Sequence, residues 1–148
     1  MNTVNIKVLE NGTPFYTDDN EKRIEKGDSG YDLYITETTI IPPFTTALLP
    51  LGISASSDYG GGLFVMARSS VWKRNLMMCN SIGLIDMGYR GEIKAPIYNG
   101  NSTPQEIESG TRLCQLVLPN AKPFIVKFVD ELSDTIRGDG GFGSTGIK

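Results

Sequence analysis

The chain has 148 residues, a length that suits one domain and leaves little room for a second. Its formal net charge of −3 argues against a broadly basic nucleic-acid-binding face. It contains no histidine, which excludes every Ser-His or Cys-His nucleophile, so carboxylates must do any proton chemistry. With two cysteines and no apolar run of about 20 residues, the sequence predicts a soluble protein from a reducing compartment.

Short strands are predicted from the first residues onward. Residues 4–8 alternate between apolar and polar side chains, as in a half-buried strand, whereas residues 10–26 are predicted to form a polar loop. One short helix is expected to start at Ser69 or Ser70 and to end near Leu76. Further strands are expected at residues 31–35, 47–49, 53–55, 63–67, 82–85, 92–98, 113–118 and 124–129.

This spacing of strands predicts an all-β sandwich or barrel, with antiparallel pairing favoured because no helix is long enough for repeated crossovers. Residues 87–91 have the length of a hairpin connection, so the strands around them are expected to pair and to place Asp86 at the hairpin's mouth. The final twelve residues include five glycines and are expected to form a mobile arm. The predicted division is a domain at residues 1–136 and an arm at residues 137–148.

Two features could bind an anion. Arg68 with Ser69 and Ser70 precedes the predicted helix, where hydroxyls and free N–H groups either cap the helix or bind phosphate. The glycine-rich arm does not match the P-loop motif for phosphate binding. Its backbone N–H groups and Phe142 could nevertheless close over a ligand that carries both a phosphate and a flat ring. No calcium-loop pattern is present, which leaves Mg²⁺ held mainly by a substrate's phosphates as the compatible metal.

Five segments in chain order resemble the five motifs of the trimeric deoxyuridine triphosphatase (dUTPase) family. Each motif alone is weak, but five at the right spacing over residues 30–146 are specific. The segments are 30–33 (GYDL), 68–70 (RSS), 83–92 (GLIDMGYRGE), 110–116 (GTRLCQL) and 137–146 (RGDGGFGSTG).

The resemblance implies a distorted jelly-roll-like β barrel with one short helix and a flexible C-terminal arm. It further implies a homotrimer in which each active site is built from all three subunits. The implied reaction is Mg²⁺-dependent hydrolysis of dUTP to dUMP and pyrophosphate, which limits uracil in DNA and supplies dUMP for dTMP synthesis. No direct nucleic-acid or membrane partner is implied, and the expected compartment is the cytoplasm, or the nucleus for a eukaryotic or viral source.

The same resemblance assigns roles to individual residues. Asp86 would activate the water that attacks the α-phosphorus, and Asp32 would hold Mg²⁺ through water. The phosphates would be bound by Arg68, Ser69, Ser70, Gln115, Arg137, Gly143, Ser144 and Thr145. Uracil and deoxyribose would be bound by Asn80, Gly83, Ile85, Tyr89 and Phe142.

Two alternatives stay open at this point. A dCTP deaminase of the same fold, or a bifunctional relative, would need a catalytic glutamate in the strand after residue 91, where this chain has Pro96 or a neighbour of it. A nucleotide-sensing protein on the same fold would bind dUTP without needing turnover.

Overall fold

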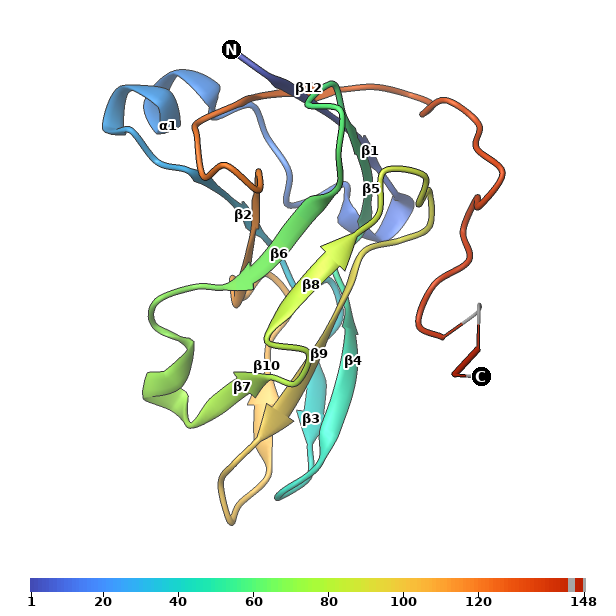
Figure 1. The fold of residues 1–148 in the computed structure, drawn as a ribbon. Helices are drawn as coiled ribbons and strands as arrows, with labels where there is room; N and C mark the ends of the chain where they lie inside the picture. Colours follow the sequence, from blue (N-terminus) through green and yellow to red (C-terminus); the bar gives the residue numbers. More distant parts are fainter. Residues whose placement is uncertain (144–145, 148) are drawn as a thin grey trace.

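The computed structural model describes residues 1–143 and 146–147, which form mostly short strands (Figure 1). One α-helix, α1 (Asn20–Lys26), and two 3₁₀ turns, η1 (Glu10–Gly12) and η2 (Val71–Arg74), accompany them. None of these described helices is long and apolar enough to cross a membrane. The strands are β1 (Thr3–Val8), β2 (Gly30–Leu33), β3 (Thr39–Ile41), β4 (Thr46–Pro50), β5 (Ile53–Ser57), β6 (Leu63–Ala67), β7 (Leu76–Met78), β8 (Ile82–Ile85), β9 (Lys94–Asn99), β10 (Gln105–Ile107), β11 (Cys114–Val117) and β12 (Ile125–Phe128).

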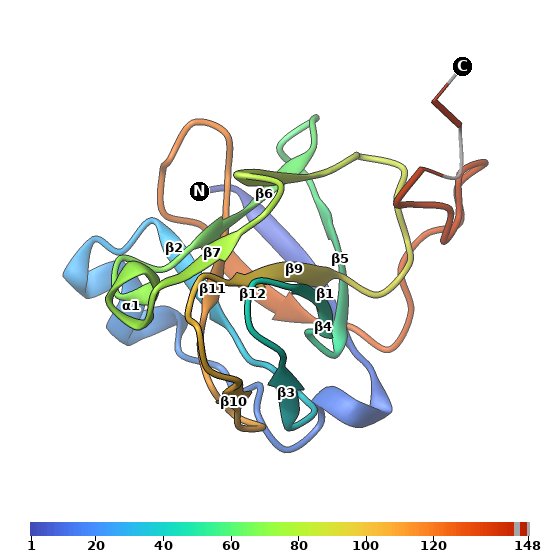
Figure 2. The same ribbon diagram turned by 90° about the horizontal axis from the view of Figure 1, so that it is seen from below.

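The strands form four small sheets that surround one interior (Figure 2). Their orders are β12-β1-β5, β10-β3, β2-β11-β6-β8 and β4-β9-β7, so the described residues form a jelly-roll-like all-β fold without a single closed barrel. All pairings are antiparallel except that of β1 with β12. These two strands lie at opposite ends of the chain, so the long connection that parallel pairing needs is available.

Alternating burial along the strands builds one apolar core. In β1, Val4 and Ile6 are fully buried, while the residues between and beside them are partly exposed. Leu33 of β2, Leu116 of β11 and Phe124 beside β12 complete the same cluster from distant parts of the chain. Burying each such side chain stabilises the fold by about 1.5–3 kcal/mol, so this core sets the positions of the strand ends.

Phe124→Ala is expected to lower the free energy of unfolding by about 3–5 kcal/mol. The ring is fully buried, and the guanidinium carbon of Arg23 lies 4.6 Å from its centroid, so the substitution leaves both a cavity and a less well covered buried cation. Urea unfolding measures the change, with Ile125→Ala, at a side chain that is 39% exposed, as the matched control. A loss below about 1 kcal/mol at Phe124 would contradict its place in the core.

The prediction of a polar loop at residues 10–26 was wrong in part, because α1 occupies residues 20–26. The side chain that anchors this helix is the cation Arg23, so the buried face carries little of the apolar signal that periodicity detects. Gly27 ends the helix with φ 74°, a left-handed conformation that favours glycine. The helix expected after Ser69 or Ser70 is only the 3₁₀ turn η2, which Asn75 ends with φ 52°.

The predicted hairpin around residues 87–91 was also wrong. β8 pairs with β6, whereas β9 pairs with β4 and β7, so this connection joins two different sheets. Just before β9, the Ile93 N–H donates to the Ile53 carbonyl and the Ile93 carbonyl accepts from Leu51, which directs the chain away from β8. Asp86 therefore lies where β8 leaves its sheet, at the start of a crossover.

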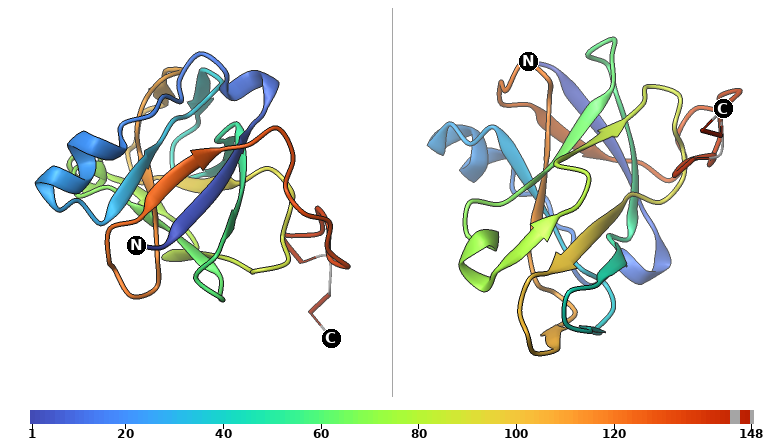
Figure 3. Two further views of the ribbon diagram at one scale, coloured as in Figure 1. Left: turned by 90° about the horizontal axis from the view of Figure 1, so that it is seen from above. Right: turned by 60° about the horizontal axis from the view of Figure 1, so that its bottom comes forward.

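The described part of the arm lies against this crossover, on the side of the molecule opposite α1 (Figure 3). The Arg90 N–H donates to the Gly138 carbonyl, and Tyr89 and Gly138 form an isolated parallel bridge. The Thr135 hydroxyl also donates to the Gly88 carbonyl. These contacts bring residues 135–142 beside Asp86, and the mobility of the arm stays a prediction.

Candidate active site

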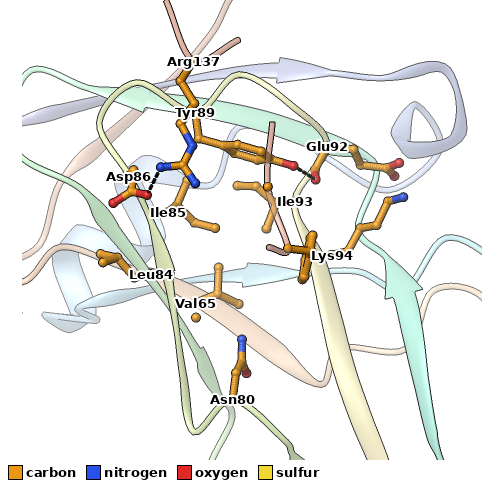
Figure 4. Close-up of a pocket in the computed structure, with 13 residues that line it drawn as sticks. Val65, Asn80, Leu84, Ile85, Asp86, Tyr89, Glu92, Ile93, Lys94 and Arg137 are labelled. Carbon is orange, nitrogen blue, oxygen red and sulfur yellow. Dashed lines mark hydrogen bonds and ion pairs between the residues drawn. The ribbon is translucent and has the colours of Figure 1, made fainter. Parts of the chain in front are cut away.

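A cavity of about 180 Å³ opens between β8, the crossover after it, the start of β9 and the arm (Figure 4). It contains every residue that the sequence assigned to uracil and deoxyribose, together with Asp86 and Arg137. We call it the crossover cavity. Its lining residues are Val65, Asn80, Gly83, Leu84, Ile85, Asp86, Tyr89, Glu92, Ile93, Lys94, Arg137, Gly141 and Phe142.

Two glycines keep the crossover cavity open and bring the arm to it. A Cβ atom on Gly83 would lie 3.2 Å from the Asn80 amide nitrogen and 3.4 Å from the Val65 Cβ, two residues that line the cavity. A Cβ on Gly141 would lie only 2.9 Å from the ring of Tyr89. Glycine at 141 therefore lets the arm backbone pass directly over the Tyr89 ring.

Asp86 and Arg137 form an ion pair at the edge of the crossover cavity. The Asp86 side chain is 44% exposed, so solvent and a ligand can reach the carboxylate. An Asp oxygen that is accessible and acts as a hydrogen-bond acceptor is suited to take a proton from water. The guanidinium beside it is suited to bind a phosphate oxygen.

Tyr89, a residue of the crossover, contacts the arm and is fixed by a hydrogen bond within the crossover. Its hydroxyl donates a hydrogen bond to the Glu92 carbonyl with an O···O distance of 2.8 Å. Burial raises the pKa of this hydroxyl above its usual value, because removal from water penalises the phenolate. The ring therefore stays neutral at ordinary pH and offers a flat, fixed surface to a ligand.

A second cavity of about 450 Å³ lies between α1 and the sheet of β2, β11 and β6. We call it the cationic cavity, because five of its lining side chains are basic and three are acidic. It contains four residues that the sequence assigned to phosphate or metal: Asp32, Arg68, Ser69 and Gln115. Its lining residues are Asp19, Lys22, Arg23, Lys26, Asp28, Ser29, Gly30, Asp32, Arg68, Ser69, Arg112 and Gln115.

Strand register brings the groups of the cationic cavity together. Gln115 of β11 lies opposite Asp32 of β2, and the Gln115 amide nitrogen lies 3.4 Å from the Ala67 carbonyl at the end of β6. The Asp32 carboxylate binds Arg68 Nε at 2.8 Å through one oxygen and Arg112 Nη1 at 3.0 Å through the other. A Cβ on Gly30 would lie 2.1 Å from the Gln115 side-chain oxygen, so glycine at 30 leaves the room that Gln115 needs.

The donor groups fit one kind of metal ion. In the described part of the chain, no group of three or more Asp, Glu, Cys or His side chains is arranged to hold a metal. Asp32 supplies a single carboxylate, 28% exposed, beside residues suited to phosphate. Mg²⁺ keeps several waters and binds through one or two carboxylates and substrate phosphates, so this set fits Mg²⁺ held chiefly by a ligand's phosphates.

The structure does not unite the two cavities within one chain. Their lining residues do not overlap: Asp86, Tyr89 and Phe142 belong to the crossover cavity, whereas Asp32 and Arg68 belong to the cationic cavity. Ser70 and Gly143 line neither cavity, and Ser144 and Thr145 lie outside the described residues.

Several lining residues were missed by the sequence-based assignment. Arg112 lies inside the fourth motif, residues 110–116, but only the fold shows that it pairs with Asp32. Lys22, Arg23 and Lys26 were placed in a loop, although their spacing is that of one helix face and could have signalled a basic helix. Glu92 and Lys94 line the crossover cavity, and no pattern in the sequence separated them from other charged residues.

Comparison with known proteins supports the resemblance inferred from the motifs. The sequence model of the dUTPase family matches residues 19–146. The deoxyuridine 5'-triphosphate nucleotidohydrolase of Escherichia phage T5 is 46% identical over 109 residues, covering 73% of this chain and 74% of that protein. The enzyme of the same name from Picosynechococcus sp. is 41% identical over 122 residues, covering 82% of this chain and 86% of that protein.

Solved structures agree with these sequence matches. The dUTPase of Streptococcus mutans superposes with a TM-score of 0.65 at 31% identity, covering 82% of this chain and 96% of that one. The dUTPase of Staphylococcus bacteriophage 80alpha, solved with dUPNHPP, superposes with a TM-score of 0.66 at 28% identity and covers 99% of this chain.

Proposed function

The chain belongs to the dUTPase family, and on this premise we propose that it hydrolyses dUTP to dUMP and pyrophosphate. One observation carries the proposal beyond the family match. The residues expected to bind the nucleoside meet with Asp86 and Arg137 in the crossover cavity, while Arg68, Ser69 and Gln115, three of the residues expected to bind phosphate, meet with Asp32 in the cationic cavity. Such an enzyme limits the incorporation of uracil into DNA and supplies dUMP for dTMP synthesis.

In the proposed reaction, Asp86 accepts a proton from a water molecule that attacks the α-phosphorus of dUTP. The new bond joins the water oxygen to that phosphorus, and the bond from phosphorus to the bridging oxygen breaks. The electron pair of the broken bond leaves with pyrophosphate. Asp86 suits this role because its carboxylate is accessible and lies beside Arg137, which can release it to bind phosphate.

The charge on the phosphates is met by several groups. Arg68, Ser69, Ser70 and Gln115 donate hydrogen bonds to phosphate oxygens, and Arg137, Gly143, Ser144 and Thr145 of the arm close over them. Asp32 would hold Mg²⁺ through water, and the chemistry that the ion would supply when bound is neutralisation of charge on the phosphates. Arg68 and Arg112 orient the Asp32 carboxylate for this contact.

Specificity arises in the crossover cavity. The Asn80 amide and the backbone groups at Gly83 and Ile85 bind the polar edge of uracil, and the Tyr89 ring lies under the deoxyribose, where a ribose hydroxyl would clash. Phe142 covers the base. The methyl group of thymine and the reversed donor and acceptor pattern of cytosine are rejected in such a pocket.

We further propose a homotrimer with shared active sites. Within one chain the two cavities share no lining residue, so a complete site needs the cationic cavity of one copy beside the crossover cavity of another. Large apolar side chains are also exposed, including Trp72 at 72% and Leu84 and Met87 at 60% each. Surfaces of this kind are typical of protein interfaces.

A pyrophosphate-release assay tests the activity. With Mg²⁺, dUTP is expected to react at least about 10²-fold faster, by kcat/KM, than dTTP, dCTP or UTP, and chelating the metal is expected to lower the rate with dUTP. Ammonia released from dCTP at turnover rates would instead identify a deaminase. Pro96 in β9 argues against that outcome, because proline cannot act as an acid or base.

A further inference from the structure

Helix α1 turns a basic face toward the cationic cavity. Lys22, Arg23 and Lys26 line this cavity together with Asp19, the residue just before the helix. Positions 19, 22, 23 and 26 recur at the spacing of one helix face, so all four side chains leave the helix on the same side. The opposite wall of the cavity carries Arg68 and Asp32.

Arg23 fixes the orientation of this face. Its side chain is 3% exposed and its guanidinium carbon lies 4.6 Å from the Phe124 ring centroid and 5.7 Å from that of Tyr31. One guanidinium nitrogen donates to the Phe124 carbonyl and, at 3.0 Å, to the Asn20 side chain. A buried cation held in this way locks the helix to the core, and Lys22 and Lys26 are thereby presented at the cavity.

The positive charge on this wall is poorly neutralised. In the described part of the chain, neither Lys22 nor Lys26 has a carboxylate within 4 Å. Arg23 Nε lies 3.6 Å from Asp19, and its Nε and Nη1 have no hydrogen-bond acceptor. Across the cavity, by contrast, Asp32 pairs with both Arg68 and Arg112.

We propose that Lys22 and Lys26 bind the terminal phosphates of the nucleoside triphosphate and thereby select substrates by phosphate-chain length. This inference rests on the proposed function, which places the same phosphates at Arg68, Ser69 and Gln115 of this cavity. The reacting α-phosphorus must lie beside Asp86, which lines the crossover cavity and not the cationic cavity, so the cationic cavity receives the part of the phosphate chain that leaves as pyrophosphate. Long lysine side chains at an exposed helix face reach a phosphate as mobile point charges.

The role differs from that of the groups around Asp32. Lys22 and Lys26 are exposed and carry no part of the bond-breaking step, so their contacts hold substrate and transition state alike. Loss of such uniform binding raises KM and leaves kcat nearly unchanged. Arg23 is a positioning residue for the two lysines.

The test uses the full-length protein with the double substitution Lys22→Gln/Lys26→Gln, called the α1 variant. The control, Lys122→Gln/Lys127→Gln, removes the same charge from exposed positions that line neither cavity. At fixed Mg²⁺ and ionic strength, the α1 variant is expected to raise the KM for dUTP by about tenfold and to weaken inhibition by pyrophosphate by a similar factor. Inhibition by dUMP, which has a single phosphate, should change less than about twofold. The variant Lys22→Arg/Lys26→Arg should restore most of the affinity.

The outcomes separate this inference from the proposed function. If the unmodified protein releases no pyrophosphate from dUTP, the proposed function fails. If the α1 variant is active with KM and pyrophosphate inhibition like those of the control, the role of α1 is overturned while the function stands. An equal weakening of dUMP and pyrophosphate would also overturn it, because loss of contacts to the terminal phosphates cannot weaken a nucleotide that has only the first phosphate.

Discussion

Replacing Asp86 with asparagine is expected to lower kcat for dUTP hydrolysis by about 10²–10⁴-fold, the usual contribution of one general base. The amide has nearly the same size as the carboxylate but cannot accept the proton of the attacking water. Affinity for the nucleotide should be retained, because Asp86 contributes no contact to the base. Pyrophosphate release measures kcat, and binding of a non-hydrolysable dUTP analogue measures the affinity.

Two further variants serve as controls for Asp86→Asn. Asp130→Asn removes a carboxylate at an exposed position outside both cavities and should leave kcat unchanged. Arg137→Gln breaks the same ion pair from the other side, and it should weaken the binding of the triphosphate, unlike Asp86→Asn. An Asp86→Asn variant with unaltered kcat would remove Asp86 from the role of base.

Ending the chain at Ile136 is expected to lower kcat by about 10²-fold or more while the folded domain is retained. The truncation removes Arg137 beside Asp86, the Gly138 contact with Arg90 and the cover that Phe142 gives the crossover cavity. It leaves the core untouched. Steady-state kinetics and urea unfolding, measured on the same preparation, separate the two effects.

The crossover itself should survive the truncation. Arg90 Nε still donates to the Ser133 carbonyl, and the Thr135 hydroxyl still donates to the Gly88 carbonyl. The midpoint of urea unfolding should therefore shift little. Phe142→Ala, which removes only the ring, should give a smaller loss of about tenfold. Kinetics identical to those of the full chain after truncation would show that the arm does not close the site.

Local patterns in the sequence predicted the positions of most strands, but not of β3, β7 and β10, because strand-forming residues and turn residues are recognised from their neighbours alone. They could not predict partners. The segment at residues 87–91 has the length and glycines of a hairpin, yet Ile93 binds Leu51 and Ile53, and β9 joins another sheet. The choice of partner is decided by where the whole chain buries its apolar faces.

Helix α1 is a second element that local sequence patterns did not predict. Its anchor is Arg23, whose guanidinium lies over the ring of Phe124, a residue 101 positions farther along the chain. A cation stabilised by a distant aromatic ring leaves no apolar period in its own segment. The sequence therefore predicted a polar loop there and missed the lysines that line the cationic cavity.

The sequence by itself determined the family of this protein, through the order of five motifs, because motifs depend only on which residues are present. The lack of histidine also led to the prediction that a carboxylate transfers the proton. Only the tertiary structure decided that Gln115 lies opposite Asp32, that Arg137 reaches Asp86, and that the two cavities lie apart in one chain. Such contacts join residues far apart in sequence, and only the packing of one shared core brings them into reach.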